Sequence, residues 1–188
     1  AIVLVKFIIF PGLGLILGTG FPVVAVVSCS MEHEESNCWA DCYMRGGDFN
    51  SCFNKPKTLC GQVVAEGEEY WDVCGEWYEE KGISQEKFET FDFNNGFNIG
   101  DIFVLVGTDD VELGEVIVYD NGFSSAPIIH RAISVNGSTY QTKGDHNMAM
   151  SSFEKNVTQN QVRGKALLRI PYLGWVKIMF NMLFRGLI

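Results

Sequence analysis

A long apolar stretch at the start of the chain runs directly into a pair of serines. Residues 1–27 carry a single charged side chain, Lys6, and a Ser-Cys-Ser unit follows at residues 28–30. About 20 residues, each rising about 1.5 Å, are needed to cross the hydrocarbon core of a bilayer. The pattern therefore predicts a transmembrane anchor over residues 1–20. A cleaved secretory signal is the alternative, and it is disfavoured because the apolar stretch leaves no room for a leader ahead of the serines.

A second apolar stretch forms the C-terminal part of the chain. Its polar side chains Lys177, Asn181 and Arg185 recur at every fourth position, which places them in one stripe on a helix. An apolar helix with a narrow polar stripe is typical of the membrane interface. We expect residues 171–188 to form a membrane-associated helix, apolar or amphipathic, with a core helix of a soluble domain as the alternative.

Length and charge limit the classes of protein to consider. The chain has 188 residues and a formal net charge of -9, so it can hold one domain with a substantial core. A nucleic-acid partner is not expected, because a phosphate backbone requires a basic face. Most of the acidic side chains lie between Glu32 and Asp92. We interpret that run as a solvated surface, with acidic cell-surface chemistry or cation binding as the alternatives.

The cysteines are concentrated in the same acidic segment. The chain has six of them, at Cys29, Cys38, Cys42, Cys52, Cys60 and Cys74. A small, loop-rich segment buries little apolar surface, so disulfides are favoured, and two disulfides among its five cysteines would leave one over. The pairing does not follow from the sequence. Zinc binding, for which Cys38 and Cys42 have suitable spacing, and free thiols remain alternatives.

Three residues have the chemistry of a serine hydrolase. A serine hydroxyl is a weak nucleophile until a base takes its proton, and the base works best when a third group holds its ring. Ser30, His130 and Asp145 can fill these roles. Each of them alone also has an ordinary structural explanation. The other histidines, His33 and His146, are expected at the surface.

Four segments of the chain resemble the conserved boxes of signal peptidase I in its archaeal and endoplasmic-reticulum form. The first contains Pro-Val-Val-Ala-Val-Val-Ser-Cys-Ser-Met-Glu, and the last contains Gly-Lys-Ala-Leu-Leu-Arg-Ile-Pro-Tyr-Leu-Gly. In order, the four are residues 21–33, 127–131, 143–147 and 164–176. A Gly-Asp-Ile strand near residue 101 is also similar. The resemblance covers residues 21–33 and 97–176, about half of the chain, and omits the cysteine-rich segment.

The resemblance implies a role for each candidate residue. Ser30 corresponds to the nucleophile, His130 to the general base and Asp145 to the carboxylate that orients the imidazole. Ser28 corresponds to the hydroxyl that helps to stabilise the oxyanion. No metal or cofactor is implied.

Two positions depart from the family pattern. Cys29 stands where the family usually has glycine between the two serines. Ser151 stands where many relatives carry a second aspartate, and Glu154 is the nearest carboxylate that could support the site in its place.

The fold expected from the resemblance is a mostly β catalytic domain, similar to that of signal peptidases, between the two membrane segments. Short runs rich in valine and isoleucine, separated by turn residues, predict its strands. They are residues 102–106, 115–119, 128–135 and 162–170. A helix is expected over residues 76–89. The domain should span residues 21–170 and carry the cysteine-rich acidic insertion at about residues 34–96.

The expected activity is that of a membrane-bound serine endopeptidase. It would remove signal peptides from exported preproteins by cutting after small residues, as in Ala-x-Ala. Its expected partners are those preproteins and the lipid bilayer, with the catalytic domain on the extracytoplasmic side of the cell membrane and subunit partners not predicted. The alternative is a catalytically inactive, membrane-anchored surface protein whose insertion binds a partner.

Overall fold

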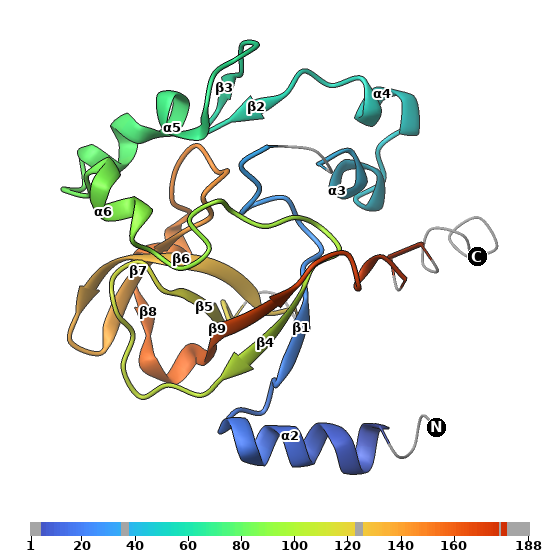
Figure 1. The fold of residues 1–188 in the computed structure, drawn as a ribbon, viewed down its shortest axis with the longest axis vertical. Coiled ribbons are helices and arrows are strands. Elements are labelled where there is room, and N and C mark those ends of the chain that lie inside the picture. Colours follow the sequence, from blue (N-terminus) through green and yellow to red (C-terminus); the bar gives the residue numbers. More distant parts are fainter. Residues whose placement is uncertain (1–4, 35–37, 123–125, 177, 180–188) are drawn as a thin grey trace.

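One antiparallel sheet forms the centre of the computed structural model and curls into a half-barrel (Figure 1). Across this 7-stranded sheet the order is β1-β4-β9-β5-β6-β7-β8. The strands are β1 (Val23–Ala25), β4 (Ile102–Val106), β5 (Val116–Tyr119), β6 (Ile128–Asn136), β7 (Thr139–Lys143), β8 (Val157–Thr158) and β9 (Val162–Ile170). The structure describes residues 5–34, 38–122, 126–176 and 178–179. The four predicted valine- and isoleucine-rich runs correspond to β4, β5, β6 and β9.

The core on one face of the sheet fixes the segment that follows β1. Met31, directly after the second serine, is completely buried and packs in one cluster with Phe97 and Phe103. The Phe97 amide donates a hydrogen bond of 3.0 Å to the Met31 carbonyl oxygen. Burial of a side chain of this size contributes about 1.5–3 kcal/mol, so the serine segment has a firm attachment to the sheet.

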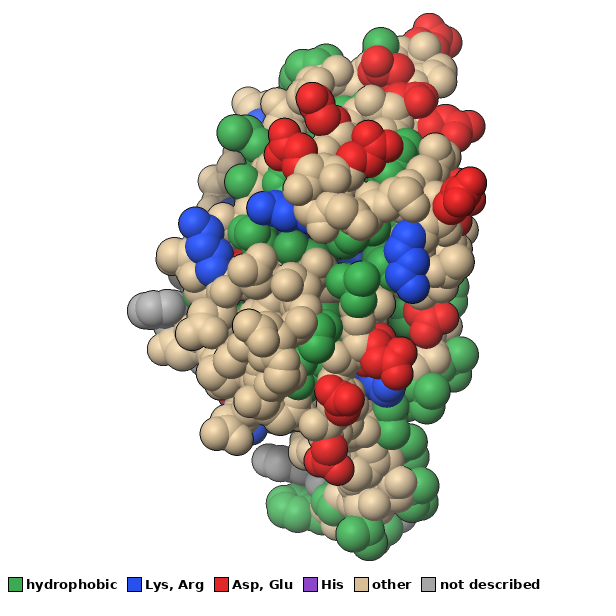
Figure 2. All heavy atoms as spheres, turned by 90° about the vertical axis from the view of Figure 1, so that its left-hand side faces the viewer, with side chains coloured by type: hydrophobic (Ala, Val, Ile, Leu, Met, Phe, Trp, Pro, Cys, Tyr) green, Lys and Arg blue, Asp and Glu red, His purple; other side chains and the backbone are tan. Residues whose placement is uncertain are grey.

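The insertion is formed by short helices and a small hairpin. Its elements are α3 (Cys38–Met44), α4 (Phe49–Phe53), β2 (Thr58–Leu59), β3 (Gln62–Val63), α5 (Tyr70–Glu79) and α6 (Gln85–Glu89). The single helix predicted over residues 76–89 is two helices, because Gly82 lies between them in a left-handed conformation (φ 76°). Figure 1 shows the insertion over one end of the sheet, and acidic side chains gather on this part of the surface in Figure 2.

Three disulfides hold the insertion together. They join Cys29 to Cys38, Cys42 to Cys52 and Cys60 to Cys74. The disulfide prediction is therefore confirmed. Two disulfides lie within the insertion, as expected, and the cysteine left over there, Cys38, pairs with Cys29 from the serine segment.

The predicted N-terminal transmembrane helix is wrong. The apolar stretch is divided into a π-helical turn, η1 (Val5–Ile9), and an α-helix of 8 residues, α2 (Phe10–Leu17). The α-helix ends because Gly18 adopts a left-handed conformation (φ 65°) and its amide bonds to the Gly14 carbonyl oxygen. Within the described ranges, no helix has both the length and the apolar character that crossing a bilayer requires.

The predicted C-terminal helix over residues 171–188 lies largely outside the described residues. The described part turns at residues 171–174 and then packs against the insertion. Ile178 is buried in a small cluster with Ala40 of α3 and Ile99, and Trp175 packs beside them. This end of the sheet and the first helix of the insertion therefore share a core.

Candidate active site

The serine segment is attached to the loop that follows β7. The amide of His146 donates a hydrogen bond of 2.9 Å to the Ser30 carbonyl oxygen. The amide of Asp145 lies 3.3 Å from the sulfur of Met31 and donates to it. Two segments that are more than a hundred residues apart in the chain are thus held side by side, with Ser30 between them.

His130 lies on β6 with its two ring nitrogens in different surroundings. The residue is 6% exposed, and its Nδ1 lies 2.5 Å from Oε1 of Glu154. Its Nε2 lies on the side of Gly144 and of the Ser30 backbone carbonyl. A carboxylate on Nδ1 favours the tautomer in which Nε2 is free to accept a proton.

Glu154 is presented to His130 by a capped 3₁₀ turn, η2 (Ser152–Lys155). Ser151 is the N-cap, and its amide donates a hydrogen bond of 2.6 Å to Oε2 of Glu154. Burial raises the pKa of Glu154, but the hydrogen bond and charge of His130 outweigh it, so the pKa lies below its ordinary value. Glu154 is therefore ionised at neutral pH. The serine that replaces the family's second aspartate is the residue that caps this turn.

Gly144 leaves the space in which the serine segment and the imidazole approach each other. A Cβ atom at this position would lie 2.6 Å from the Ser30 carbonyl oxygen and 2.8 Å from Nε2 of His130. It would also lie 2.6 Å from the side-chain nitrogen of Asn147. Only glycine fits here, because real Cβ atoms do not approach other heavy atoms so closely.

Both serines and His130 line one cavity with a volume of about 540 Å³. The hydroxyl oxygens of Ser28 and Ser30 lie 3.2 Å apart and share a hydrogen bond. In the described chain, the hydroxyl of Ser30 is thus paired with Ser28 and has no hydrogen bond to the imidazole. Apolar side chains line much of the rest of this cavity, and they come from Ala25, Val27, Ala126, Pro127, Ile128, Ile129 and Phe153.

Asp145 does not hold the imidazole, contrary to its predicted role. Its two carboxylate oxygens bind Arg131 at 2.8 to 3.2 Å, the Tyr78 hydroxyl at 3.0 Å and Nε2 of His33 at 3.0 Å. The physical reason is strand geometry. Adjacent residues on β6 point to opposite faces, so a carboxylate paired with Arg131 lies on the other side of the strand from the His130 ring.

The Asp145–Arg131 pair is the centre of a buried network that joins the insertion to the sheet. Burial raises the pKa of Asp145, but Arg131 and then His33 outweigh it and hold the pKa well below its usual range. The expectation that His33 would lie at the surface is wrong. It is 9% exposed and stacks on Tyr70 of α5 with ring centroids 3.5 Å apart. Tyr78, also from α5, completes the network.

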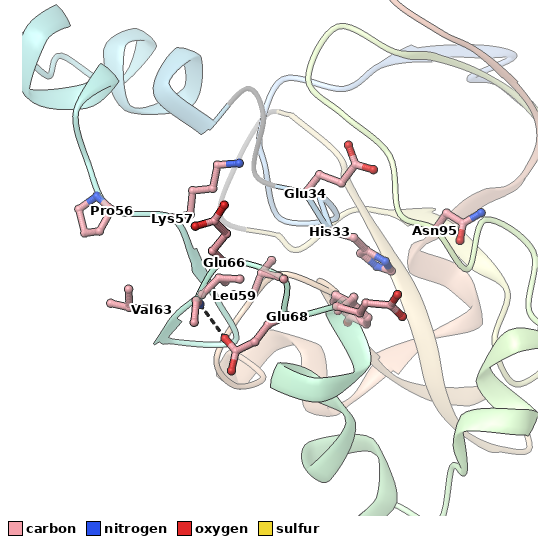
Figure 3. Close-up of a pocket in the computed structure, with 14 residues that line it drawn as sticks. His33, Glu34, Pro56, Lys57, Leu59, Val63, Glu66, Glu68 and Asn95 are labelled. Carbon is pink, nitrogen blue, oxygen red and sulfur yellow. Dashed lines mark hydrogen bonds between the residues drawn. The ribbon is translucent and has the colours of Figure 1, made fainter.

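A larger cavity, of about 1090 Å³, lies on the insertion beside this network (Figure 3). His33 forms part of its wall, and the β2–β3 hairpin with Leu59 and Val63 forms another part. Glu68 faces it from the following loop, where its carboxylate accepts a hydrogen bond of 2.6 Å from the Ala65 amide. None of the described residues that line it is a serine, threonine or cysteine.

Lys143 is a second buried cation near the candidate site. Its ammonium group donates to the carbonyl oxygens of Gly144 and Asp145 at 3.1 and 3.2 Å, and it lies 4.7 Å from the ring centre of Trp77. Burial lowers the pKa of Lys143 to about 8, against the opposing charge of Asp145. The contacts with two successive carbonyl groups give it a structural role beneath the loop that carries Gly144.

The zinc alternative is not supported for the cysteines. Cys38 and Cys42 belong to two different disulfides. Among the described residues, Cys29, Cys38 and His146 have donor atoms within 4.8 Å of one another. Zinc binds cysteine as the thiolate, and these two sulfur atoms are bonded to each other.

Several residues of the site were not identified from the sequence. Arg131, Tyr78, Lys143 and the buried role of His33 depend on partners far apart in the chain. Glu154 was identified as the nearest carboxylate that could support the site, and it also had a local signal, because Ser151-Ser152-Phe153-Glu154 has the serine-to-glutamate spacing of a capping box.

The comparisons with known proteins do not identify a family. The chain matches no protein-family model and no curated protein.

Proposed function

We propose that this protein is a serine endopeptidase of the signal peptidase I type. The observation that carries the proposal is the arrangement around Gly144. The backbone carbonyl of Ser30 and Nε2 of His130 lie beside the same point, and Ser30 and His130 line one cavity. Glu154 lies on the opposite nitrogen of the imidazole. This is the order of groups that nucleophilic catalysis by serine requires, with Glu154 in place of the expected aspartate.

In the proposed reaction, Ser30 Oγ attacks the carbonyl carbon of the scissile bond and His130 Nε2 takes the hydroxyl proton. Glu154 stabilises the imidazolium that results, because its carboxylate stays ionised beside Nδ1. The imidazolium then gives the proton to the leaving amine as the C–N bond breaks. Water, activated by the same imidazole, releases the acyl group and restores the serine. Before attack, the hydroxyl of Ser30 must turn from Ser28 toward the imidazole.

Ser28 supports the oxyanion in this proposal. Its hydroxyl lies 3.2 Å from that of Ser30, close to where charge develops on the attacked carbonyl oxygen. Loss of one such donor typically costs about 10²–10³ in turnover. Ser28→Ala should therefore slow cleavage without abolishing it.

The expected substrate is an exported preprotein with small residues before the cut. The cavity supports this because side chains such as Val27, Ile129 and Phe153 give it apolar walls. β1 is the first strand of the sheet and pairs only with β4 among the described strands. An extended substrate could add to its other edge, which ends at the serine segment.

An extracytoplasmic site next to a membrane belongs to the same proposal. Three disulfides favour an oxidising compartment. On α2, Leu15 and Ile16 are 86% and 81% exposed, and apolar side chains exposed together indicate a contact surface. A bilayer is the partner that we propose for this surface.

The test is cleavage of a preprotein by purified protein in detergent. We expect release of the signal peptide, and we expect Ser30→Ala to abolish it. Ser152→Ala is the matched control, since it removes another hydroxyl close to the site but outside the cavity. Cleavage by the Ser30→Ala protein at the normal rate would refute the proposal.

A second candidate is a surface protein in which the insertion binds a partner and no peptide bond is cut. The cavity of about 1090 Å³ on the insertion favours it. The two candidates differ in a depletion strain. Rescue by Ser30→Ala and His130→Ala proteins would support the binding function, whereas failure of both with normal protein levels would support the peptidase.

A further inference from the structure

The Cys29–Cys38 disulfide attaches the first helix of the insertion to the serine segment. Cys29 lies between Ser28 and Ser30, and its Cα atom is 5.3 Å from that of Cys38 at the start of α3. The cysteine that replaces the glycine of related boxes is therefore a covalent link between the insertion and the candidate nucleophile. This link places α3 beside the cavity.

One face of α3 is fixed to the body of the protein. Ala40 is completely buried in a cluster with Ile99 and Ile178. Trp39 stacks on Trp175 with ring centroids 6.2 Å apart. These contacts on one side and the disulfide at its first residue fix the position of α3 relative to the sheet.

Asp41 in the first turn of α3 and Arg45 just beyond its end line the same cavity as Ser30 and His130. Their spacing of four residues places both on one side of the helix. Nε of Arg45 donates to Oδ1 of Asp41 at 2.6 Å, and Oδ2 of Asp41 lies 3.9 Å from the sulfur of Cys29. Asp41 thus lies between the serine segment and Arg45.

The guanidinium group of Arg45 is available to a ligand. Its side chain is 71% exposed, against 18% for that of Asp41. Asp41 engages Nε, and the two terminal nitrogens of Arg45 make no hydrogen bond with the described residues. A guanidinium presents parallel N–H groups that match the two oxygens of a carboxylate. Asp41 is already paired, so an incoming carboxylate is favoured over an incoming ammonium group.

The cavity is divided into an apolar and a polar part. Ala25 of β1 and Ile128 and Ile129 at the start of β6 line it with apolar side chains. Asp41 of α3 and Arg45 just beyond that helix line it with charged side chains. Under the proposed function, the small residues before the scissile bond occupy the apolar part. The residues after the bond then extend along α3.

We propose that α3 selects substrates, with Arg45 binding an acidic side chain within the first residues after the scissile bond. Asp41 holds the guanidinium in place, and the Cys29–Cys38 disulfide keeps both residues at a fixed position relative to Ser30. This inference rests on the proposed peptidase function and assigns a specificity determinant to it. Arg45 and Asp41 act on substrate position and take no part in the bond-breaking step.

The test uses signal-peptide substrates that end in Ala-x-Ala and carry Asp, Asn or Lys at each of the next three positions. For at least one of these positions, we expect kcat/KM to be about tenfold higher with Asp than with Lys, mainly through KM. Arg45→Glu should reverse that order. Lys55→Glu is the matched control, because it makes the same charge change at an exposed cation outside this cavity and should preserve the preference.

A second arm tests the disulfide. In a Cys29→Gly/Cys38→Ala protein, we expect the ratio between the Asp and Lys substrates to fall to about one, because α3 loses its attachment to the serine segment. Retention of the full ratio in this protein would overturn the role of the disulfide. An equal response to Asp and Lys in the unmodified protein, or an unchanged preference in Arg45→Glu, would overturn the role of Arg45.

Binding to a Ser30→Ala protein separates this inference from the proposed function. The Ser30→Ala protein should bind the Asp peptide more tightly than the Lys peptide, and the Ser30→Ala/Arg45→Glu protein should not. That result would support the Arg45 site without any cleavage. If the unmodified protein cuts none of the peptides, the proposed function fails. If it cuts them all through Ser30 without regard to charge, only the specificity role of α3 fails.

Discussion

Nδ1 of His130 and Oε1 of Glu154 lie 2.5 Å apart, although β6 and η2 are separated by a full strand and two turns. This contact defines the carboxylate that orients the imidazole. The two candidate carboxylates therefore have different partners: Glu154 binds His130, whereas Asp145 binds Arg131.

The first prediction concerns the role of Glu154. Glu154→Gln keeps the size of the side chain but removes the charge that stabilises the imidazolium, so turnover of a preprotein should fall by about 10³-fold or more. Steady-state cleavage kinetics measure this. Glu115→Gln, which changes a carboxylate paired with Lys165 outside the cavity, is the control and should cut normally. Normal turnover by Glu154→Gln would show that this carboxylate does not support catalysis.

The second prediction concerns the space at Gly144. Gly144→Ala places a methyl group within 2.8 Å of Nε2 of His130 and closer still to the Ser30 carbonyl oxygen. Because the methyl group displaces Ser30 and His130, we expect turnover to fall roughly 10²-fold. Thermal unfolding should show that the variant is still folded. Gly137→Ala is the control for the loss of a glycine, since a Cβ there meets open space, although its φ of 57° adds some strain. A fully active Gly144→Ala protein would contradict the proposed approach of Ser30 and His130.

The third prediction concerns acid stability. The pKa of Asp145 is lower in the folded protein than its ordinary value of 3.8, since Arg131 and His33 outweigh the effect of burial. A group of this kind stabilises the fold above its unfolded pKa, and that contribution is lost as the pH falls toward the folded value. The free energy of unfolding, measured with urea, should therefore decrease from about pH 5 to about pH 2.

Removal of the Asp145 charge should flatten that profile. Asp145→Asn leaves Arg131 buried without its counter-ion and should cost about 3–5 kcal/mol at neutral pH. Asp120→Asn, which breaks a half-exposed pair with Arg163, should cost less than about 1 kcal/mol. If the free energy of unfolding falls equally in the two variants, the buried Asp145–Arg131 pair stabilises the fold no more than the half-exposed pair does.

The fourth prediction concerns the exposed apolar side chains of α2. Leu15→Glu and Ile16→Glu should weaken binding to phospholipid vesicles in a flotation assay, because each removes apolar area that would enter the interface. Val63→Glu changes an equally apolar side chain, 67% exposed on the insertion, and should leave vesicle binding unaltered. Unchanged flotation of the α2 variants would exclude this helix as the membrane contact.

Local patterns in the sequence were sufficient for β4, β5, β6 and β9 and for part of the site. β4 and β9 begin and end where the valine- and isoleucine-rich runs predicted, since strand alternation is a short-range signal. Ser30 and His130 were identified by the resemblance of their flanking residues, and both line one cavity. In contrast, the roles of Asp145 and His33 depend on Arg131 and Tyr70, which no local pattern connects to them.

The predicted membrane helix failed for a reason that was present in the sequence. Mean hydropathy reports how apolar a segment is, but it does not report where the backbone turns. Gly18 in a left-handed conformation ends α2, and Pro11 lies in its first turn. A proline near the start of a helix and a glycine at its end limit the length of the helix, however apolar the stretch is.

Arg131 links the insertion to the sheet. Its guanidinium group donates to the carbonyl oxygens of Asp92 and Phe93, where the insertion ends, and to that of Gly114 beyond β4. A shortened chain that lacks the insertion would take away two of the groups that bind this cation, the carbonyl oxygens of Asp92 and Phe93, and leave it with Asp145 and Gly114. The cysteine-rich segment is therefore part of the same folded unit as the sheet, because a buried cation of β6 needs its carbonyl groups.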